Sequence, residues 1–406
     1  MTGTSTDHVV SLIIFLTAIL LFIGLFNQTI QTGITYQKQS YTNKKTSDLL
    51  DTMLLTPGIQ TKGSPVEFGV QDPEFTQYQM NPFALMRLQS SQGTPVSYAK
   101  TPGITYSSIT FGNNYLLTPS TDSINYSTAL ELLGIRGSYG FQLAFTPTLK
   151  VQVTETATNP LSFGISVVGT GFPVSNAAVS YCLVTVLMNG ASTPDFENVV
   201  SGQTGTVITD ASGLASVQFP VSTSASLTYA FVVYAHLDGV TGVGYIQQAP
   251  TGTKSVIPFD SNLSAQQVLI AHSDDVPNNS GSNDLIYYNS TFIFVNENYD
   301  FHQTPPGNAS DQFGVVRSGA GYPCGTISLS SYNPGILVVA YSNNGNQGIV
   351  MMPWGLSSLG FPLIFGGDPS NQSQVSSDIR QIQVNGVSYQ AKLSLWNVQG
   401  YQVINQ

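Results

Sequence analysis

Residues 9–26 read VVSLIIFLTAILLFIGLF, a run of 18 positions without a charged side chain. As a helix this run is about 27 Å long, close to the ~30 Å hydrocarbon core of a bilayer. A backbone in lipid has to satisfy its own hydrogen bonds, so the run is predicted to be a membrane-spanning helix. The lipid bilayer is therefore the first partner that we expect for this chain.

The helical pattern continues beyond Phe26, because a loose apolar stripe recurs until Thr56-Pro57-Gly58 interrupts it. A helix over roughly residues 5–55 would be about 75 Å long. Residues 1–56 are thus predicted to form a transmembrane and stem helix. The stripe consists of Ile30, Ile34, Tyr41, Leu49, Leu50, Met53 and Leu54.

The eight residues before the apolar run, MTGTSTDH, contain no Lys or Arg. A secretory signal peptide has a positive segment there and a shorter apolar core, so an uncleaved anchor is the better interpretation. Lys38, Lys44 and Lys45 follow the span, and the positive-inside rule would keep them in the cytoplasm. Because these lysines lie 12 or more residues beyond the span, we still expect a single-pass N-terminal anchor in the cell membrane with an extracellular body.

The composition predicts a folded body with an unusual surface. Only 8% of the residues are charged, against about 25% in an average soluble protein. The chain is nevertheless 41% hydrophobic and 11% aromatic, which is enough to form packed cores. The formal net charge of −10 argues against binding to nucleic acid.

The body is predicted to be mainly β. The sharpest local signal is IRQIQV–NG–VSYQAKLSLW, in which Asn385-Gly386 supplies a type I′ hairpin turn and apolar residues alternate afterwards. We expect a small α+β or β domain over 66–158 and a C-terminal β domain over 255–406. No repeat of fixed period is evident.

Residues 160–250 are predicted to form a β-sandwich. The strand-like runs FGISVVG, AAVSYCLVTVLM, LASVQFPV and LTYAFVVYAHL alternate with turns at 171–177 and 209–213, with Asp210 as a turn residue. This pattern resembles the Ig-like β-sandwich modules of bacterial and archaeal surface proteins. The fold class is therefore expected to be mainly β, with Ig-like sandwich domains and one long N-terminal helix.

The first 55 residues, a long apolar stem before a β-rich head, resemble type IV pilins and pilin-like surface proteins of archaea. That resemblance implies a filament subunit, in which many copies bundle their stems.

The search for catalytic signatures is negative. The sequence has no H-E-x-x-H, G-x-S-x-G, C-x-x-C or P-loop motif, so we predict no catalytic and no cofactor-binding residues. An acidic loop at 272–284 makes calcium a candidate ligand, because Ca²⁺ prefers oxygen ligands. The candidate calcium ligands are Asp274, Asp275 and Asp284.

Six Asn-x-Ser/Thr triplets in the body are candidate glycosylation sites, although each is equally explained as a turn. They lie at Asn125, Asn262, Asn278, Asn289, Asn308 and Asn371. Cys182 lies in an apolar run and is expected to be a buried small side chain. A disulfide between Cys182 and Cys324 is the alternative.

These observations favour a membrane-anchored extracellular glycoprotein with a structural or adhesive role and no catalytic activity. Its partners would be other copies of itself or other surface proteins and glycans. The first alternative is a pilin-like filament subunit that assembles through its N-terminal helix. The second is a tethered extracellular glycan-processing enzyme, whose paired carboxylates can lie far apart in sequence.

Overall fold

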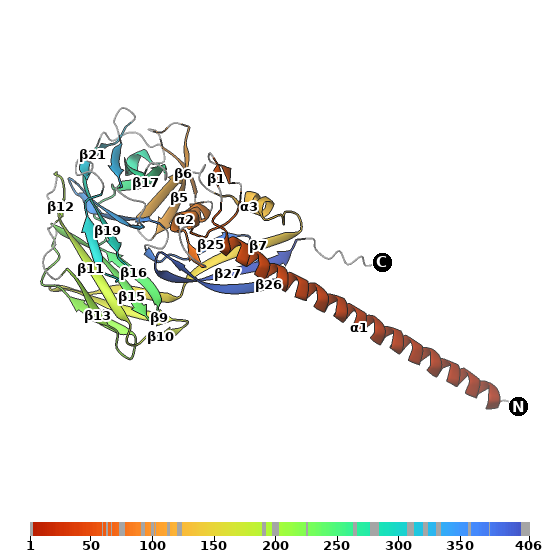
Figure 1. The fold of residues 1–406 in the computed structure, drawn as a ribbon. Coiled ribbons are helices and arrows are strands. Elements are labelled where there is room, and N and C mark those ends of the chain that lie inside the picture. Colours follow the sequence, from red (N-terminus) through yellow and green to blue (C-terminus); the bar gives the residue numbers. More distant parts are fainter. Residues whose placement is uncertain are drawn as a thin grey trace.

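The computed structural model shows a long helix that projects from a β-rich body, with the N-terminus at the far end of the helix (Figure 1). The predicted fold class, mainly β with one long N-terminal helix, is confirmed. The structure describes residues 3–398 apart from 59, 62–63, 66, 73–77, 91–93, 99–100, 102, 112–113, 120–123, 189–191, 197–202, 225, 263–265, 277–283, 307–311, 320–323, 330–333, 356–358 and 373.

The first sandwich follows the predicted Ig-like pattern. One sheet contains β8, β9, β10 and β14, and the facing sheet contains β11, β12, β13, β15 and β16. The order β8-β9-β14 opposite β16-β15-β11 is the A-B-E and G-F-C arrangement of Ig-like domains. The strands are β8 (Leu149–Thr158), β9 (Leu161–Gly169), β10 (Phe172–Pro173), β11 (Ala178–Leu187), β12 (Asp195–Phe196), β13 (Thr204–Ile208), β14 (Leu214–Gln218), β15 (Leu227–Leu237) and β16 (Val240–Gln247).

Asp210 is a turn residue in this sandwich, as predicted. Its carboxylate oxygen Oδ1 accepts hydrogen bonds from the backbone N–H of Ser212 at 2.8 Å and of Leu214 at 3.0 Å. Gly213 adopts a φ of +70°, which favours glycine. The side chain therefore holds the connection between β13 and β14.

A second sandwich repeats the strand order of the first. β17 pairs with β18 and β18 with β22, while β19 pairs with β20, β21 and β23, and β23 with β24. Each strand follows its counterpart at nearly the same offset, close to the ~100 residues of one Ig-like domain. The strands are β17 (Val256–Asn262), β18 (Gln267–His272), β19 (Leu285–Val295), β20 (Phe301–Thr304), β21 (Phe313–Arg317), β22 (Gly325–Ser328), β23 (Gly335–Asn343) and β24 (Asn346–Trp354).

The expectation that the chain has no repeat was therefore wrong at the level of topology. One side-chain pair marks the repeat as well. Tyr181 lies opposite Gly205 in the first sandwich, and Tyr288 lies opposite Gly314 at the equivalent position of the second. A Cβ on either glycine would lie 2.5 Å or 2.7 Å from the tyrosine hydroxyl oxygen, so each tyrosine requires the space above its glycine.

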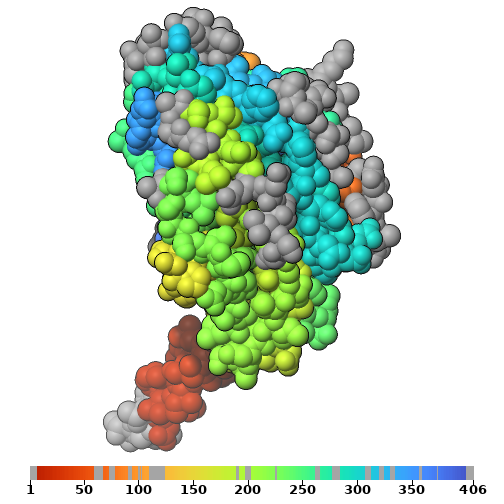
Figure 2. Space-filling view, turned by 90° about the vertical axis from the view of Figure 1, so that its left-hand side faces the viewer, coloured from red at the N-terminus to blue at the C-terminus, as the bar shows by residue number. Residues whose placement is uncertain are grey.

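The two sandwiches lie side by side, green and cyan in Figure 2. They pack against each other through the β11–β15 and β19–β23 sheets. On β15, Phe231 and Val233 enter the core of the first sandwich, while Ala230 and Val232 enter the core shared with the second. The apolar run LTYAFVVYAHL lacks polar alternation because its strand is buried on both faces. The result is a stack of four sheets with two buried central layers.

Additional strands extend the second sandwich. β6 (Asn114–Pro119) pairs in parallel with β17 and continues the sheet to β5 (Thr105–Phe111) and β4 (Thr94–Ser97). On the outer face of this sheet, the rings of Tyr98 and Tyr106 each lie edge-on to Phe259, with centroids 5.0 Å apart. A separate short pair is formed by β1 (Gln60–Thr61) and β2 (Ser64–Pro65).

A fifth larger sheet, here called the base sheet, carries the helix α1 (Gly3–Leu55). Its order is β25-β7-β27-β26-β3, and the predicted hairpin provides β26 and β27, with φ of +47° at Asn385 and +77° at Gly386. Two short helices, α2 (Pro82–Ser90) and α3 (Tyr126–Leu132), complete the elements of this region. The strands are β3 (Gln79–Met80), β7 (Tyr139–Pro147), β25 (Leu363–Gly366), β26 (Val375–Val384) and β27 (Val387–Asn397).

Strand pairing distributes residues 66–158 over three parts of the body. β4–β6 extend the second sandwich, β7 lies in the base sheet, and β8 starts the first sandwich. Residues 255–406 likewise contribute to both the second sandwich and the base sheet. The predicted boundaries at 56, 66, 158, 160, 250 and 255 stay a prediction about which parts of the chain fold independently.

Cys182 and Cys324 do not form a disulfide. Cys182 lies on β11 and is 2% exposed, and burial raises the pKa of its thiol to about 12. Cys324 packs at the edge of the cluster around Phe259. The interpretation of Cys182 as a buried small side chain is confirmed, and the disulfide alternative is wrong.

Candidate functional site: the stem and its joint with the head

The stem, defined as residues 3–42 of α1, projects away from the body. Among the described residues, α1 is the helix that is long and apolar enough to span a membrane, and its most apolar window is not buried against any other part of the chain. Large side chains are exposed on all sides, for example Leu20 at 69% and Phe22 at 69%. A helix that is apolar all round requires an apolar surrounding, which lipid supplies.

Several threonine hydroxyl groups along α1 donate hydrogen bonds to the helix itself. Thr17 donates to the carbonyl oxygen of Ile13, and Thr29 donates to that of Leu25, each at 2.8 Å. Such i−4 bonds let a hydroxyl group enter an apolar medium without a lost hydrogen bond. The polar residues in and next to the run are therefore compatible with insertion.

The joint, defined as residues 43–55 of α1, is fixed to the base sheet by a polar network around Arg380. The guanidinium donates to Asp51 Oδ1 at 3.0 Å and to Ser47 Oγ at 2.9 Å, and it pairs with Asp378 at 2.8 Å. The hydrogen bond to Asp51 is the largest cause that raises the pKa of Arg380 above its ordinary value. Arg380 thus stays charged and connects one face of α1 to β26.

Apolar contacts complete the joint. Leu50, Met53 and Leu54 are fully buried in the core that the base sheet shares with the two sandwiches. Lys45 lies with its ammonium 4.3 Å from the centroid of the Tyr139 ring, a cation–π geometry. One of the three lysines behind the apolar run is therefore engaged by the head.

The end of α1 is closed by a returning segment of the backbone. Val70 N–H donates to Met53 O at 3.0 Å, and Gln71 N–H donates to Thr56 O at 3.1 Å, so orphan carbonyl groups at the helix end are satisfied. This approach needs glycine at position 69, because a Cβ there would lie 2.0 Å from Thr56 O. The backbone of residues 69–71 therefore passes directly against the end of α1.

We expect Gly69→Val to loosen the joint. The added side chain collides with the backbone and should cost about 1–3 kcal/mol of stability, as overpacking does. Thermal unfolding of the full chain in detergent micelles and the rate of proteolysis near residue 56 measure the effect. Gly33→Ala is the control, since nothing lies within 4 Å of its Cβ. A Gly69→Val variant that melts and resists protease like the control would contradict the close passage.

Two of the three predicted calcium ligands, Asp274 and Asp284, lie close together, and Asp275 does not join them. The ligand atoms of His272, Asp274 and Asp284 lie within 4.8 Å of one another. The ammonium group of Lys254 donates to Asp284 Oδ2 and lies 3.6 Å from Asp274 Oδ2. Asp275 is 3% exposed and accepts a hydrogen bond from Gly319 N–H at 2.8 Å instead.

Sequence reasoning missed both Lys254 and His272 as members of this cluster. Strand β18 places His272 beside the loop, where its Nδ1 accepts a hydrogen bond from Asp274 N–H at 3.1 Å. The pKa of His272 is lowered from its ordinary value, mainly because the imidazole is buried. The cluster therefore joins two carboxylates, a neutral imidazole and an ammonium that supplies positive charge where a cation would bind.

We expect Lys254 to compete with calcium at this cluster. Added Ca²⁺ should shift the melting temperature of the wild-type chain little, whereas Lys254→Met should lower stability in EDTA and recover it with Ca²⁺. The neutral side chain removes the positive charge and leaves two carboxylates for the ion. Lys392→Met on the exposed face of β27 is the matched control. Equal calcium responses of both variants would contradict this interpretation.

The glycosylation candidates have different surroundings. Asn125 is exposed but caps α3, with Oδ1 accepting from Thr128 N–H at 2.8 Å, and Asn371 is exposed in a turn. Asn289 is 9% exposed and its Nδ2 donates to Pro194 O at 2.9 Å, a position without room for a glycan. Asn278 and Asn308, and the side chain of Asn262, lie outside the described residues. Glycosylation of the exposed sites stays a prediction.

Comparisons with known proteins do not place the chain in a family. No family model matches it, and no curated protein is similar to it. Among solved structures, the chain matches a Salmonella alpha-2-macroglobulin reacted with methylamine, with 11% identity over 68% of this chain and a TM-score of 0.19. It also matches invasin, a bacterial integrin-binding protein, with 13% identity over 61% of this chain and a TM-score of 0.16. The alignments span 19% of the alpha-2-macroglobulin chain and 54% of the invasin chain. Similarities this low carry no argument about function.

Proposed function

We propose that this chain is a membrane-anchored protein of the cell surface, with a structural or adhesive role and no catalytic activity. The observation that carries the proposal is the contrast within one helix. The run at residues 9–26 is exposed and apolar around its whole circumference, whereas one face of the joint is buried in the head. A helix of this composition is stable in lipid, and the joint fixes the head to that helix.

The geometry supports presentation of the head at a distance from the membrane. Residues 27–42 of α1 lie between the apolar run and the joint, and as a helix they span about 24 Å. They are polar but carry a single charged side chain, Lys38. In this proposal they act as a spacer that holds the sandwiches above the lipid headgroups.

Labelling of intact cells tests the external position of the head. Lys150 and Lys392 are exposed on strands of the head, and a membrane-impermeant amine reagent reaches them only from outside. We expect both lysines to be modified before lysis. Modification that appears only after lysis would put the head in the cytoplasm, as the positive-inside rule suggests for Lys38 and Lys44.

A filament subunit is the second candidate, and a specific observation favours it. Ile30, Ile34, Tyr36 and Tyr41 are 44–74% exposed on the spacer, beyond the length of a single bilayer span. Packing of stems from several copies would cover these side chains. The resemblance of residues 1–55 to archaeal pilin-like stems points the same way.

Two measurements separate the candidates. Mass spectrometry of the isolated protein should find Met1 for an uncleaved anchor. A start at Thr4 would mean cleavage after Gly3 and would support pilin-type processing. Electron microscopy of material sheared from the cell surface should show no filaments containing this chain if it is a monomeric anchor. Filaments labelled by an antibody against the head would favour the second candidate.

A further inference from the structure

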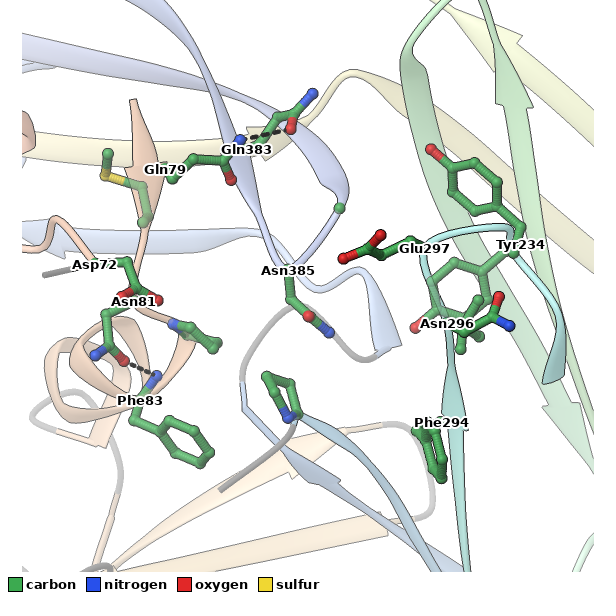
Figure 3. A pocket seen from close by; sticks show the side chains of 16 residues that line it. Asp72, Gln79, Asn81, Phe83, Tyr234, Phe294, Asn296, Glu297, Gln383 and Asn385 are labelled. Carbon is green, nitrogen blue, oxygen red and sulfur yellow. Dashed lines mark hydrogen bonds between the residues drawn. The ribbon is translucent and has the colours of Figure 1, made fainter. Parts of the chain in front are cut away.

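A cavity of about 770 Å³ lies where the base sheet, α2 and both sandwiches meet. Its walls come from β3 and the turn at Asn385-Gly386, from the start of α2, and from the loop between β19 and β20 (Figure 3). Tyr234 on β15 adds the first sandwich to the lining. Ligand sites occur preferentially at such junctions, and this volume is in the usual range.

The lining of this junction cavity is rich in carboxamides and has no basic side chain among the described residues. It contains the carboxylates of Asp72 and Glu297 and several aromatic rings. Because the described part of the wall holds no Lys, Arg or His and the chain has a formal net charge of −10, an anionic ligand is disfavoured. The carboxamides belong to Gln79, Asn81, Asn296, Gln383 and Asn385.

Several of these amides are held in place by hydrogen bonds. Gln79 Nε2 donates to Gln383 Oε1 at 2.7 Å, which occupies one end of each amide and fixes the direction of the other (Figure 3). Asn81 caps α2, since its Oδ1 accepts from Phe83 N–H at 2.9 Å and from Ala84 N–H at 3.2 Å. This wall is thus organised before any ligand binds.

The opposite wall is a loop built around Asn296. Its Oδ1 accepts hydrogen bonds from the backbone N–H groups of Asn298 and Asp300, each at 2.9 Å. Glu297 is exposed at the tip of this loop, and in Figure 3 its carboxylate extends into the space toward Asn385. Acceptor groups from two distant segments therefore face the same volume.

Aromatic rings in the wall are held by stacking. Phe294 stacks on His302 with centroids 5.2 Å apart, and Tyr299 stacks on His236 at 4.2 Å. Tyr299 has a φ of +63°, which is rare for an aromatic residue, and its hydroxyl group forms a hydrogen bond with Thr241 at 3.0 Å. Strained backbone held by its surroundings is frequent at ligand sites.

We propose that the junction cavity binds a neutral oligosaccharide. Carboxamides both donate and accept hydrogen bonds, and carboxylates accept strongly, which matches the hydroxyl groups of a sugar. Rings such as Phe294 offer a flat apolar surface to the C–H face of a pyranose. A cationic peptide side chain would bind the acceptors, but it would offer no hydrogen-bond acceptor to the amide donors of this wall.

This inference deepens the proposed adhesive role and rests on it for its biological meaning. Its test does not depend on the membrane, because binding is measured with the full chain in detergent micelles. Failure of the labelling experiment would move the head to the other side of the membrane without removing the cavity. Failure of binding would remove the ligand without changing the topology.

Calorimetric titration with neutral hexasaccharides of glucose, mannose and galactose is the experiment. We expect at least one of them to bind, and Glu297→Gln to weaken its affinity at least tenfold. Phe294→Ala should have a similar effect. The matched controls are Glu67→Gln and Phe172→Ala, both at exposed positions that do not line the cavity, which should keep wild-type affinity.

Four results would overturn the proposal. The first is no binding of any hexasaccharide at millimolar concentration. The second is binding that Glu297→Gln and Phe294→Ala leave unchanged while both variants retain the wild-type melting temperature. The third is preference for penta-lysine over every sugar, which would assign the carboxylates to a cationic partner. Cleavage of a bound hexasaccharide would also contradict a pure binding site and would make Asp72 and Glu297 candidates for a catalytic pair.

Discussion

The double variant Leu16→Arg/Leu20→Arg is expected to move the protein from the membrane fraction to the soluble or aggregated fraction. Both positions lie near the middle of the apolar run, four residues apart on one helix face, and are 50% and 69% exposed. Each arginine at a helix centre costs about 2.5–3.5 kcal/mol on an insertion scale, so the pair costs about 5–7 kcal/mol. This is as large as the favourable contribution of the whole run, which is about 4–8 kcal/mol for its Leu, Ile, Phe and Val residues.

The matched control is Ile30→Arg/Ile34→Arg, which has the same spacing on the same helix. These positions are 44% and 48% exposed, but they lie in the spacer beyond the run. We expect the control to stay in the membrane fraction after carbonate extraction. If both double variants remained membrane-bound, the apolar run would not be the anchor. If both were lost, the inserted segment would extend into the spacer.

The stem and the hairpin at Asn385-Gly386 were predictable because their signals are local. Eighteen uncharged residues define a span by length alone, and an Asn-Gly pair between alternating strands defines a turn. The first sandwich was predictable for the same reason, since turn residues such as Asp210 separate its strands. The fold class followed from these parts of the chain.

The arrangement of the sheets was not predictable, because it depends on contacts between distant segments. β7 pairs with β27 across more than half of the chain, and no local pattern records such a partner. The repeat of the sandwiches escaped detection because strand order is maintained by different apolar residues. A signal that was available is the unbroken apolar run in β15, which indicates burial on both faces.

The junction cavity could not be found from sequence either. Gln79, Glu297 and Gln383 come from three parts of the chain, and each is an ordinary polar residue in its local context. The place of Lys254 in the acidic cluster was not predictable either, because the pairing of β17 with β18 brings it beside Asp274. Local patterns identify elements, whereas these sites arise from the packing of the elements.

Val232→Asp is expected to unfold the head. Val232 lies on β15 with no exposed surface, and it belongs to the core between the two sandwiches, together with Val338 of β23. The substitution loses the burial of an apolar side chain and places a carboxyl group there. Together these changes should cost about 4 kcal/mol or more, a large part of the 5–15 kcal/mol that stabilises a typical domain.

The reciprocal variant Val338→Asp should have the same effect from the opposite sheet. Ile208→Asp is the matched control, because Ile208 is also β-branched and lies on a strand of the first sandwich but is 66% exposed. Such a surface change is expected to alter stability by less than about 0.5 kcal/mol. Denaturant unfolding followed by far-UV circular dichroism and tryptophan fluorescence measures all three. If the sandwiches did not pack together in solution, Val232 and Val338 would face water, and both variants would unfold at the same denaturant concentration as the control. A large loss in both variants therefore requires the four sheets to form one packed body, which is the condition for the junction cavity to keep its shape.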